Sequence, residues 1–239
     1  MKINAENLSF RELNEKIRSS SGKRIDIENM LGQRYTGSGC TGKDIHIPGI
    51  PGNALGAYLT GCDITVYGNA QDAVGDAMND GTITIHGSVG DAAGYGMRDG
   101  KILVKGSAGY RAGIHMKEYM EKKPLMVIGG RTGDFLAEYQ AGGRIIVLGI
   151  GFEGECPVGD FSCTGMHGGV MYIRTDHAPE LPPQVLCEDA SEEDIAAIKP
   201  DVELFSQKFG YDAEELLSAH FFRLTPDTNN PYRRLYVNN

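Results

Sequence analysis

Apolar side chains in the middle of this chain recur in short alternating groups and not in helical stripes. Pairs of Ile, Val or Met residues, separated by one residue, appear again and again, and most pairs are followed two residues later by a glycine. Side chains two positions apart on a strand share one face, so each pair predicts a short strand with one apolar face. The pairs are Ile25/Ile27, Ile45/Ile47, Ile64/Val66, Ile83/Ile85, Ile102/Val104, Met126/Ile128, Ile145/Val147 and Met171/Ile173.

The repeat of these pairs settles at nineteen residues, and other columns of the sequence keep step with it. Gly56, Gly75, Gly94 and Gly113 form one such column, and Leu59, Met78, Met97 and Met116 form another. Strands this short cannot bury an apolar face alone, so they must stack on one another. Nineteen residues are too few for a helical crossover between parallel strands. The sequence therefore predicts an all-β fold, a right-handed parallel β-helix with about 19 residues per coil.

The repeat is lost at both ends of the chain. Ser9 followed by Glu12 is a capping-box pattern, which predicts an N-terminal helix that covers the first coil. After Arg174 the chain is rich in proline, and helix-start patterns follow at Ser191 and Asp212. We therefore predict three regions: an N-terminal helical cap over residues 1–22, the β-helix over 23–176, and a helical C-terminal segment with an extended tail over 177–239.

Two coils are longer than the others. One carries the extra residues 117–123 and the other carries extra residues within 151–168, so we expect a loop to project from the stack at each place.

One outward-facing column changes character along the body. It runs His46, Thr65, Thr84, Leu103, Val127 and Ile146, from polar to apolar. An apolar surface of that extent is not expected to face water. Either the C-terminal helices and tail cover it, or another protein does.

Composition narrows the classes of protein. The 239 residues are 41% hydrophobic without a long apolar run, and residues 1–10 show no secretory signal, so we expect a cytoplasmic protein that spans no membrane. The formal net charge of −9 argues against binding nucleic acid or an anionic membrane. Five cysteines without a CxxC pair favour buried reduced thiols over a disulfide framework or a metal site.

Three patterns could carry chemistry, and each has a simpler explanation. Residues 37–43, GSGCTGK, resemble a phosphate-binding loop, but Asp44 stands where a Ser or Thr is needed and a strand, not a helix, is predicted next. The six histidines show no metal-ligand spacing. A corner column could gather a cation, although side chains of this kind at a repeated corner more often accept hydrogen bonds from the backbone. That column is Asn53, Asp72, Asp91, Tyr110 and Asp134. We predict no catalytic, cofactor-binding or metal residue in this chain.

Two stretches of the sequence resemble a known protein family. The runs over residues 52–87 and 128–149 resemble the GXGXG family, whose best-known member is the C-terminal β-helix domain of the glutamate synthase large subunit. Asn69 to Asp72 with Gly75 resembles its glycine-rich acidic signature, and Glu138-Tyr139 followed by Gly142-Gly143 resembles its closing motif. The similarity covers most of residues 29–174. A chain of this length resembles the separately encoded third-domain subunit of archaeal-type glutamate synthases, and residues 231–237 (PYRRLYV) resemble the tails of those chains.

The resemblance implies a structural role without activity of its own. In that family the β-helix holds together a glutamine amidotransferase and an FMN-containing, iron–sulfur synthase, which form glutamate from glutamine and 2-oxoglutarate. It implies those subunits as partners, with FMN and the iron–sulfur cluster in a partner and no cofactor here, and it leaves homo-oligomers open. The same domain resembles the scaffold subunit of formylmethanofuran dehydrogenases and of N-methylglutamate synthase-like complexes. A different class, a free-standing β-helix enzyme acting on carbohydrate, would need a basic groove or an exposed carboxylate pair.

Overall fold

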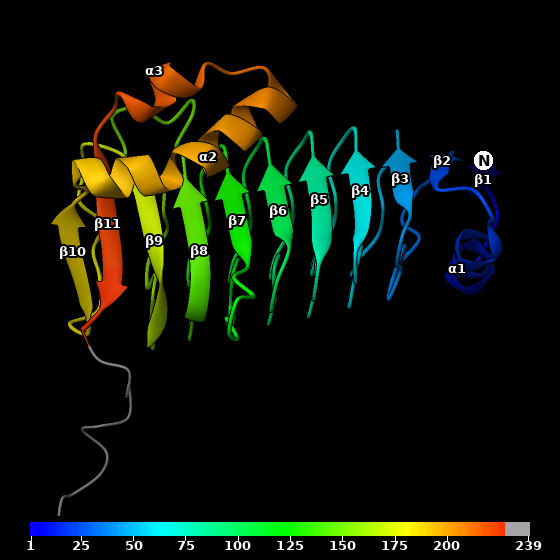
Figure 1. The fold of residues 1–239 in the computed structure, drawn as a ribbon, viewed down its shortest axis with the longest axis horizontal. Helices are drawn as coiled ribbons and strands as arrows, with labels where there is room; N and C mark the ends of the chain where they lie inside the picture. Colours follow the sequence, from blue (N-terminus) through cyan, green and yellow to red (C-terminus); the bar gives the residue numbers. More distant parts are fainter. Residues whose placement is uncertain (228–239) are drawn as a thin grey trace, which may run out of the picture.

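One sheet of eleven strands runs the length of the body in the computed structural model, which describes residues 1–227 (Figure 1). Nine strands pair in parallel in sequence order, and the last two positions of the sheet are taken by antiparallel strands in the order β9-β11-β10. The strands are β1 (Lys2–Asn4), β2 (Arg24–Glu28), β3 (Asp44–Ile47), β4 (Cys62–Val66), β5 (Gly81–Ile85), β6 (Lys101–Val104), β7 (Leu125–Ile128), β8 (Ala141–Val147), β9 (Gly168–Arg174), β10 (Val185–Asp189) and β11 (Phe221–Pro226).

The register of the sheet places the predicted apolar pairs directly over one another. Ile45 pairs with Ile64, Ile64 with Ile83 and Ile83 with Ile102, and the same ladder continues through the methionines of β7 and β9. All of these side chains are fully buried. The predicted internal ladder is therefore confirmed from β2 to β9.

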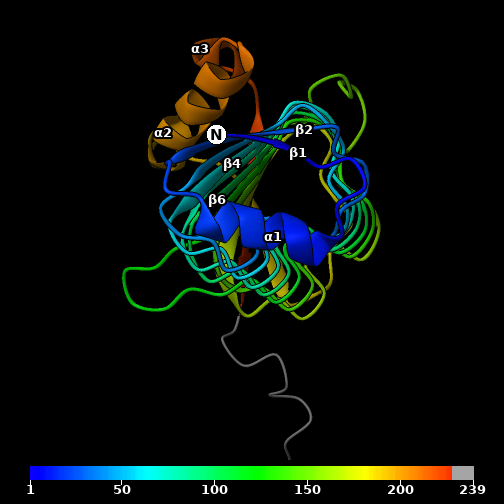
Figure 2. The ribbon, with the colours of Figure 1, turned by 90° about the vertical axis from the view of Figure 1, so that its right-hand side faces the viewer.

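The chain closes into a coil between one strand and the next. A second row of parallel backbone bridges joins Ala70 to Val89, Val89 to Ala108 and Ala108 to Thr132. Figure 2, which looks along the body, shows successive coils superimposed around a common interior. This mostly parallel, solenoid-like arrangement is consistent with the predicted β-helix.

The corner before each strand has an unusual backbone. Every second residue there adopts a left-handed conformation, as at Ala73, Gly75 and Ala77, whose φ angles are 57°, 69° and 51°. Amide groups of this corner donate alternately to the coil on either side: Ala73 N to Asp91 O, and Gly75 N to Leu55 O, both at 2.8 Å. The corner thus adds a ladder of its own to the stack. The alternating glycines of the sequence have their physical reason in this geometry.

The N-terminal end is closed by the helix α1 (Phe10–Ser19), which lies across the first coil (Figure 2). Its predicted capping box is present, because Ser9 accepts from the Glu12 amide and the Glu12 carboxylate accepts from the Ser9 amide. Leu13 and Ile17 are buried in the main core. The Lys43 Nζ donates to the carbonyl oxygens of Ser20 and Gly22, where a cation also complements the helix dipole.

The apolar half of the outward column is covered by α2 (Glu192–Phe209) and α3 (Ala213–Leu217), which lie over one face of the sheet (Figure 1). A second core forms there between Leu103, Val127 and Ile146 of the sheet and Val202 and Phe205 of α2. Of the two explanations for this apolar surface, the one that assigns it to the C-terminal helices is confirmed.

The C-terminal segment differs from the prediction in one respect. Residues from Phe221 were expected to form an irregular tail, yet Phe221–Pro226 is the strand β11, inserted between β9 and β10. The edge of β9 would otherwise be unpaired, and β11 pairs with it. Residues 1–22 likewise contain the short strand β1 in addition to the helix. Residues 231–237, which include Arg233 and Tyr236, lie outside the described residues.

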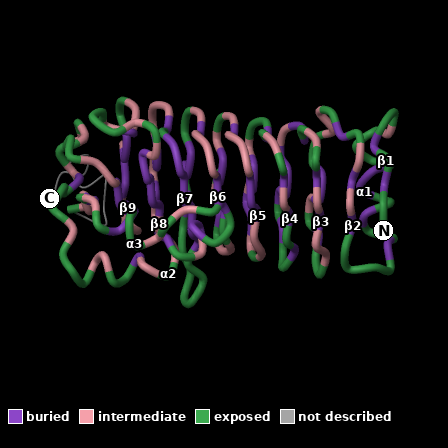
Figure 3. The backbone as a smooth tube through the Cα atoms, turned by 90° about the horizontal axis from the view of Figure 1, so that it is seen from above, coloured by how far each residue is buried: buried purple, intermediate pink, exposed green. Residues whose placement is uncertain are grey.

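Both long coils carry the expected projecting loops. In the first loop, Tyr119 and Met120 are exposed, and a bridge between Tyr119 and Lys122 closes it into a hairpin-like turn. Figure 3 shows stretches of exposed backbone at the coil ends, while the strands between them are mainly buried.

Candidate functional site

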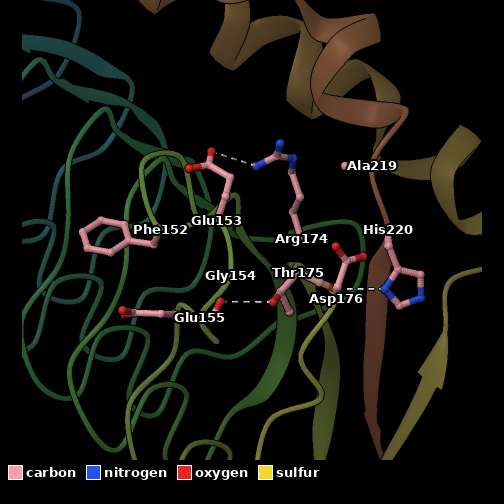
Figure 4. Close-up of a pocket in the computed structure, with 10 residues that line it drawn as sticks. Phe152, Glu153, Gly154, Glu155, Arg174, Thr175, Asp176, Ala219 and His220 are labelled. Carbon is pink, nitrogen blue, oxygen red and sulfur yellow. Dashed lines mark hydrogen bonds and ion pairs between the residues drawn. The ribbon is translucent and has the colours of Figure 1, made fainter.

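A cavity opens at the C-terminal end of the body, where the last long coil meets the start of β11 (Figure 4). It has a volume of about 190 Å³, and its lining includes Glu153, Arg174, Thr175 and His220. The Arg174 guanidinium extends from the end of β9, donates to Leu148 O at 3.0 Å and lies 3.8 Å from the Glu153 carboxylate. The cavity is therefore a small polar space with one arginine held at its wall.

His220 is fixed on both of its ring nitrogens. Nδ1 lies 2.8 Å from Thr175 O, and Nε2 lies 3.0 Å from Asp189 Oδ1. The carbonyl oxygen of Thr175 and the Asp189 carboxylate raise the pKa of His220, because both favour the protonated ring. An imidazole bound at both nitrogens ties β11 to β10 and to the end of β9.

The hydroxyl beside this histidine is also engaged. Thr175 Oγ1 donates to Glu155 O at 3.2 Å and accepts from the His177 amide at 3.1 Å. A nucleophile would need a free hydroxyl or thiol in contact with a base. The arrangement at His220 is suited to holding segments together, and Arg174 is the group that faces the cavity.

The corner column of acidic residues accepts backbone hydrogen bonds. Asp72 Oδ1 accepts from the Asp91 amide at 3.0 Å, and Asp91 Oδ1 accepts from the Tyr110 amide at 2.9 Å. Asp134 Oδ1 accepts from the Asp160 amide at 3.0 Å, while Asn53 donates to Asp72 Oδ2 at 3.4 Å. The simpler explanation of the column is the one observed. These bonds join one coil to the next.

Neither the cysteines nor the histidines meet in a metal centre in the part of the chain that the structure describes, where no group of three or more His, Cys, Asp or Glu side chains is placed to hold a metal ion. Cys40, Cys62 and Cys163 are buried free thiols, as predicted, but Cys156 is half-buried and Cys187 is exposed. Burial raises the pKa of Cys163 to about 12. Cys40 and Cys62 lie with their sulfur atoms 3.2 Å apart.

The loop that resembles a phosphate-binding motif leads into a strand. Residues 37–43 run directly into β3, and the Lys43 amine is used at the end of α1. A phosphate would have needed a helix N-terminus at that place.

No pattern in the sequence predicts that Arg174, Asp189 and His220 are neighbours. They come from β9, from β10 and from the residue before β11, which the chain brings together only through the antiparallel end of the sheet. Their spacing in the sequence follows no motif.

No helix among residues 1–227 has the length and apolar character needed to cross a bilayer.

Comparison with known proteins adds to this picture. The family described as GXGXG motif matches residues 14–227. The uncharacterized protein MJ1350 of Methanocaldococcus jannaschii is 43% identical over 249 residues, which cover 98% of this chain and 95% of the relative.

Among solved structures, a chain of the formyltransferase/hydrolase complex (FhcABCD) from Methylorubrum extorquens, determined in complex with methylofuran, superimposes with a TM-score of 0.69. The two chains are 21% identical, and the match covers 95% of this chain and 91% of the other. That likeness extends along nearly the whole of both chains, and it concerns the fold.

Proposed function

This chain belongs to the GXGXG family, and on that premise we propose that it is a non-catalytic assembly subunit of a multi-subunit enzyme, built as a right-handed parallel β-helix. One observation carries the proposal. A chain of the same fold, matched over 95% of this one, is part of a multi-subunit complex.

The use of the polar side chains supports the same conclusion. The Asp72 and Asp91 carboxylates bind amides of the next coil, Lys43 binds the end of α1, and His220 binds two strand segments. Groups that could do chemistry are thus engaged in holding coils and caps together. A rigid body of this kind is suited to fixing other subunits at a set distance.

The structural likeness favours a complex of the formyltransferase/hydrolase type as the setting. In that reading the chain would hold catalytic subunits of a formylmethanofuran-type complex, and any metal or cofactor would belong to those subunits.

The sequence motifs favour a second setting, a glutamate synthase-like complex. Glu138-Tyr139 and Gly142-Gly143 match the closing motif of that domain. These residues have structural positions that fit the motif: Tyr139 is left-handed at the corner, and a side chain at Gly142 would collide with the backbone of Glu118, where its Cβ would lie 2.4 Å from the amide nitrogen. The partners there would be a glutamine amidotransferase and an FMN-containing, iron–sulfur synthase.

Purification of the tagged full chain from its native source tests the proposal. We expect catalytic subunits to co-purify in fixed stoichiometry, as measured by quantitative mass spectrometry. A formyltransferase or a molybdenum or tungsten subunit would select the first setting, and a flavin-containing synthase with an amidotransferase would select the second. A chain that purifies alone, or that by itself cleaves a substrate such as a polyuronide, would overturn the assembly role.

A further inference from the structure

The corner of the solenoid carries a group of aromatic side chains that the coil does not need. We define the corner patch as Tyr95, Arg111, His115, Phe135, Tyr139 and Phe161. These residues lie on successive coils toward the C-terminal half of the body. Tyr95 is 43% exposed and Phe161 is 61% exposed.

Five of the six patch residues stand at left-handed backbone positions, with φ between 54° and 59°. Bulky side chains are rare in that region, and the conformation costs roughly 1 kcal/mol relative to glycine. The middle coils fill the same positions with small residues, Ala54, Ala73 and Ala92 in the column of Phe135 and Ala77 and Gly96 in the column of Tyr139, while the first coils carry Tyr35 and Tyr58 there. Because small residues close the corner equally well, closure of the coil does not explain the rings.

The patch is ordered before anything binds to it. His115 and Tyr139 stack at 5.3 Å between ring centroids, and Phe135 and Phe161 stack at 5.1 Å. Arg111 lies over the Phe135 ring at 4.6 Å and binds Glu138 Oε2 at 3.1 Å. Side chains already held in place lose little conformational entropy on binding.

The chemistry of the patch fits a protein surface. Tyr, Phe and Arg are the residue types enriched where proteins meet, especially at the residues that dominate the binding energy. Asp134 and Asp160 directly precede Phe135 and Phe161 in the chain, Asp91 accepts from the amide of Tyr110 next to Arg111, and the chain has a net charge of −9. A complementary surface would therefore be apolar at its centre and basic at its rim.

We propose that the corner patch is the docking surface for a catalytic partner subunit whose contact face is apolar, with Lys and Arg side chains around it. This inference rests on the assembly role proposed above and adds the place of contact.

Pull-down with variants of the full chain tests the docking surface. The test variant is Phe135→Ala/Phe161→Ala, and the matched control is Tyr58→Ala. Tyr58 is also left-handed and 54% exposed, but Ala77 and Gly96 separate it from the patch in its own column. Alanine occurs naturally at the Phe135 position in other coils, so the variants are expected to fold; an unchanged melting temperature checks this.

We expect the test variant to lose about tenfold or more in affinity for the purified co-purifying subunit, as the removal of dominant interface residues does. Tyr58→Ala should bind like the unaltered chain, and binding should weaken as salt rises. A photo-crosslinking residue placed at position 161 should join the chain to that same subunit.

The outcomes separate the two proposals. If the unaltered chain captures catalytic subunits and the test variant captures them equally, the docking surface is wrong and the assembly role stands. A crosslink from position 161 to a second copy of this chain would also overturn the docking surface. If the unaltered chain captures no catalytic subunit, both proposals fail.

Discussion

The glycines at the corner before each strand show how the absence of a side chain determines the packing of a coil. Gly75 has a φ of 69°, and a Cβ built there would lie 2.5 Å from Ile102 Cδ1 of the ladder. The same column holds Gly56, Gly94 and Gly113, each facing a ladder side chain in the same way. The core thus extends to the Cα atoms of the corner.

We predict that Gly75→Ala lowers the free energy of unfolding by about 3 kcal/mol, since it combines left-handed strain with overpacking against Ile102. Urea unfolding measures the loss. The control is Gly96→Ala, also left-handed with a φ of 56° but with open space around its Cβ position. That change should cost only about 1 kcal/mol, the backbone strain alone. Equal losses in the two variants would show that contact with the ladder is unimportant.

The acidic corner column leads to a second prediction. Asp72→Ala removes the acceptor of the Asp91 amide and should lower the free energy of unfolding by about 1 kcal/mol. Asp72→Asn keeps an acceptor oxygen and should be close to neutral. Because the column acts through backbone bonds, calcium should leave the melting temperature of the unaltered chain unchanged. A calcium-dependent rise that Asp72→Asn abolishes would restore the cation hypothesis.

Two histidines should give the stability opposite dependences on pH. Thr175 O and Asp189 raise the pKa of His220. The stability that protonated His220 contributes is therefore complete below the pKa that this histidine has in the unfolded chain, and it is lost as pH rises through the pKa in the folded chain. Burial, with Lys105 and Lys208 nearby, lowers the pKa of His86, so its contribution is present above the unfolded pKa and is lost as pH falls.

Unfolding free energies measured between about pH 5 and pH 9 check these signs, because both unperturbed pKa values lie near 6.5. His220→Asn should flatten the decline on the alkaline side, and His86→Asn should flatten the decline on the acidic side. If either variant kept the full slope of the unaltered chain, its histidine would not be the titrating group.

At the residue scale, the sequence indicated which residues stack in a column but not which backbone groups their side chains bind. The nineteen-residue spacing of Asp72 and Asp91 predicts that they stack, yet only the register of the coils determines which amide each carboxylate reaches. The corner patch was not predicted either, because the stacking of Phe135 on Phe161 depends on the register of the coils.

At the element scale, α2 is the covering element of the apolar half of the outward face. Phe205 is fully buried between the sheet and the rest of the helix, with Phe209 at 4.7 Å and Tyr211 at 5.7 Å between ring centroids. The second core therefore depends on one large ring near the C-terminal end of the helix.

We predict that Phe205→Ala costs about 3–5 kcal/mol of unfolding free energy, because it leaves a cavity over the sheet. A hydrophobic dye should also bind more strongly to this variant as α2 loosens. Gln207→Ala, at an exposed position of the same helix, should change stability by no more than about 0.5 kcal/mol. Unaltered dye binding in Phe205→Ala would mean that α2 is held by its other contacts.

Elements with a strong local signal were predictable, and elements defined by their partners were not. Both capping boxes, at Ser9 and Ser191, are present as the sequence indicated. The strands β1, β10 and β11 escaped prediction because they are short, lie outside the repeat and alternate weakly; four of the five residues of β10 are exposed. β1 is a strand because it pairs with β2, β11 because it pairs with β9, and β10 because it pairs with β11, and that information is not local.

At the scale of the whole molecule, stability is distributed along a stack in which each coil touches mainly its neighbours. The two ends are closed by different devices: β1 and α1 at one end, and the antiparallel pair β11 and β10 at the other. An uncovered end would present the edge of a strand and the open interior of a coil.

We predict that deletion of residues 1–22 makes the protein self-associate, because β2 becomes an exposed edge and the buried side chains of the first coil lose Leu13 and Ile17. Light scattering over a range of concentrations should show oligomers that the full chain, at the same concentrations, does not form. A truncated chain with the same particle size as the full chain would show that the cap does not protect this end.

The column of small residues at the inner corner also bears on how such a body changes length over evolution. Glycine fills it from Gly37 to Gly113, and then Ala137 and Cys163 take the place. Units between residues 52 and 113 are therefore nearly interchangeable, so duplication of one of them would insert a ready-made coil. The later units carry extra residues and other corner residues, so a copy of one of them would fit its neighbours less well.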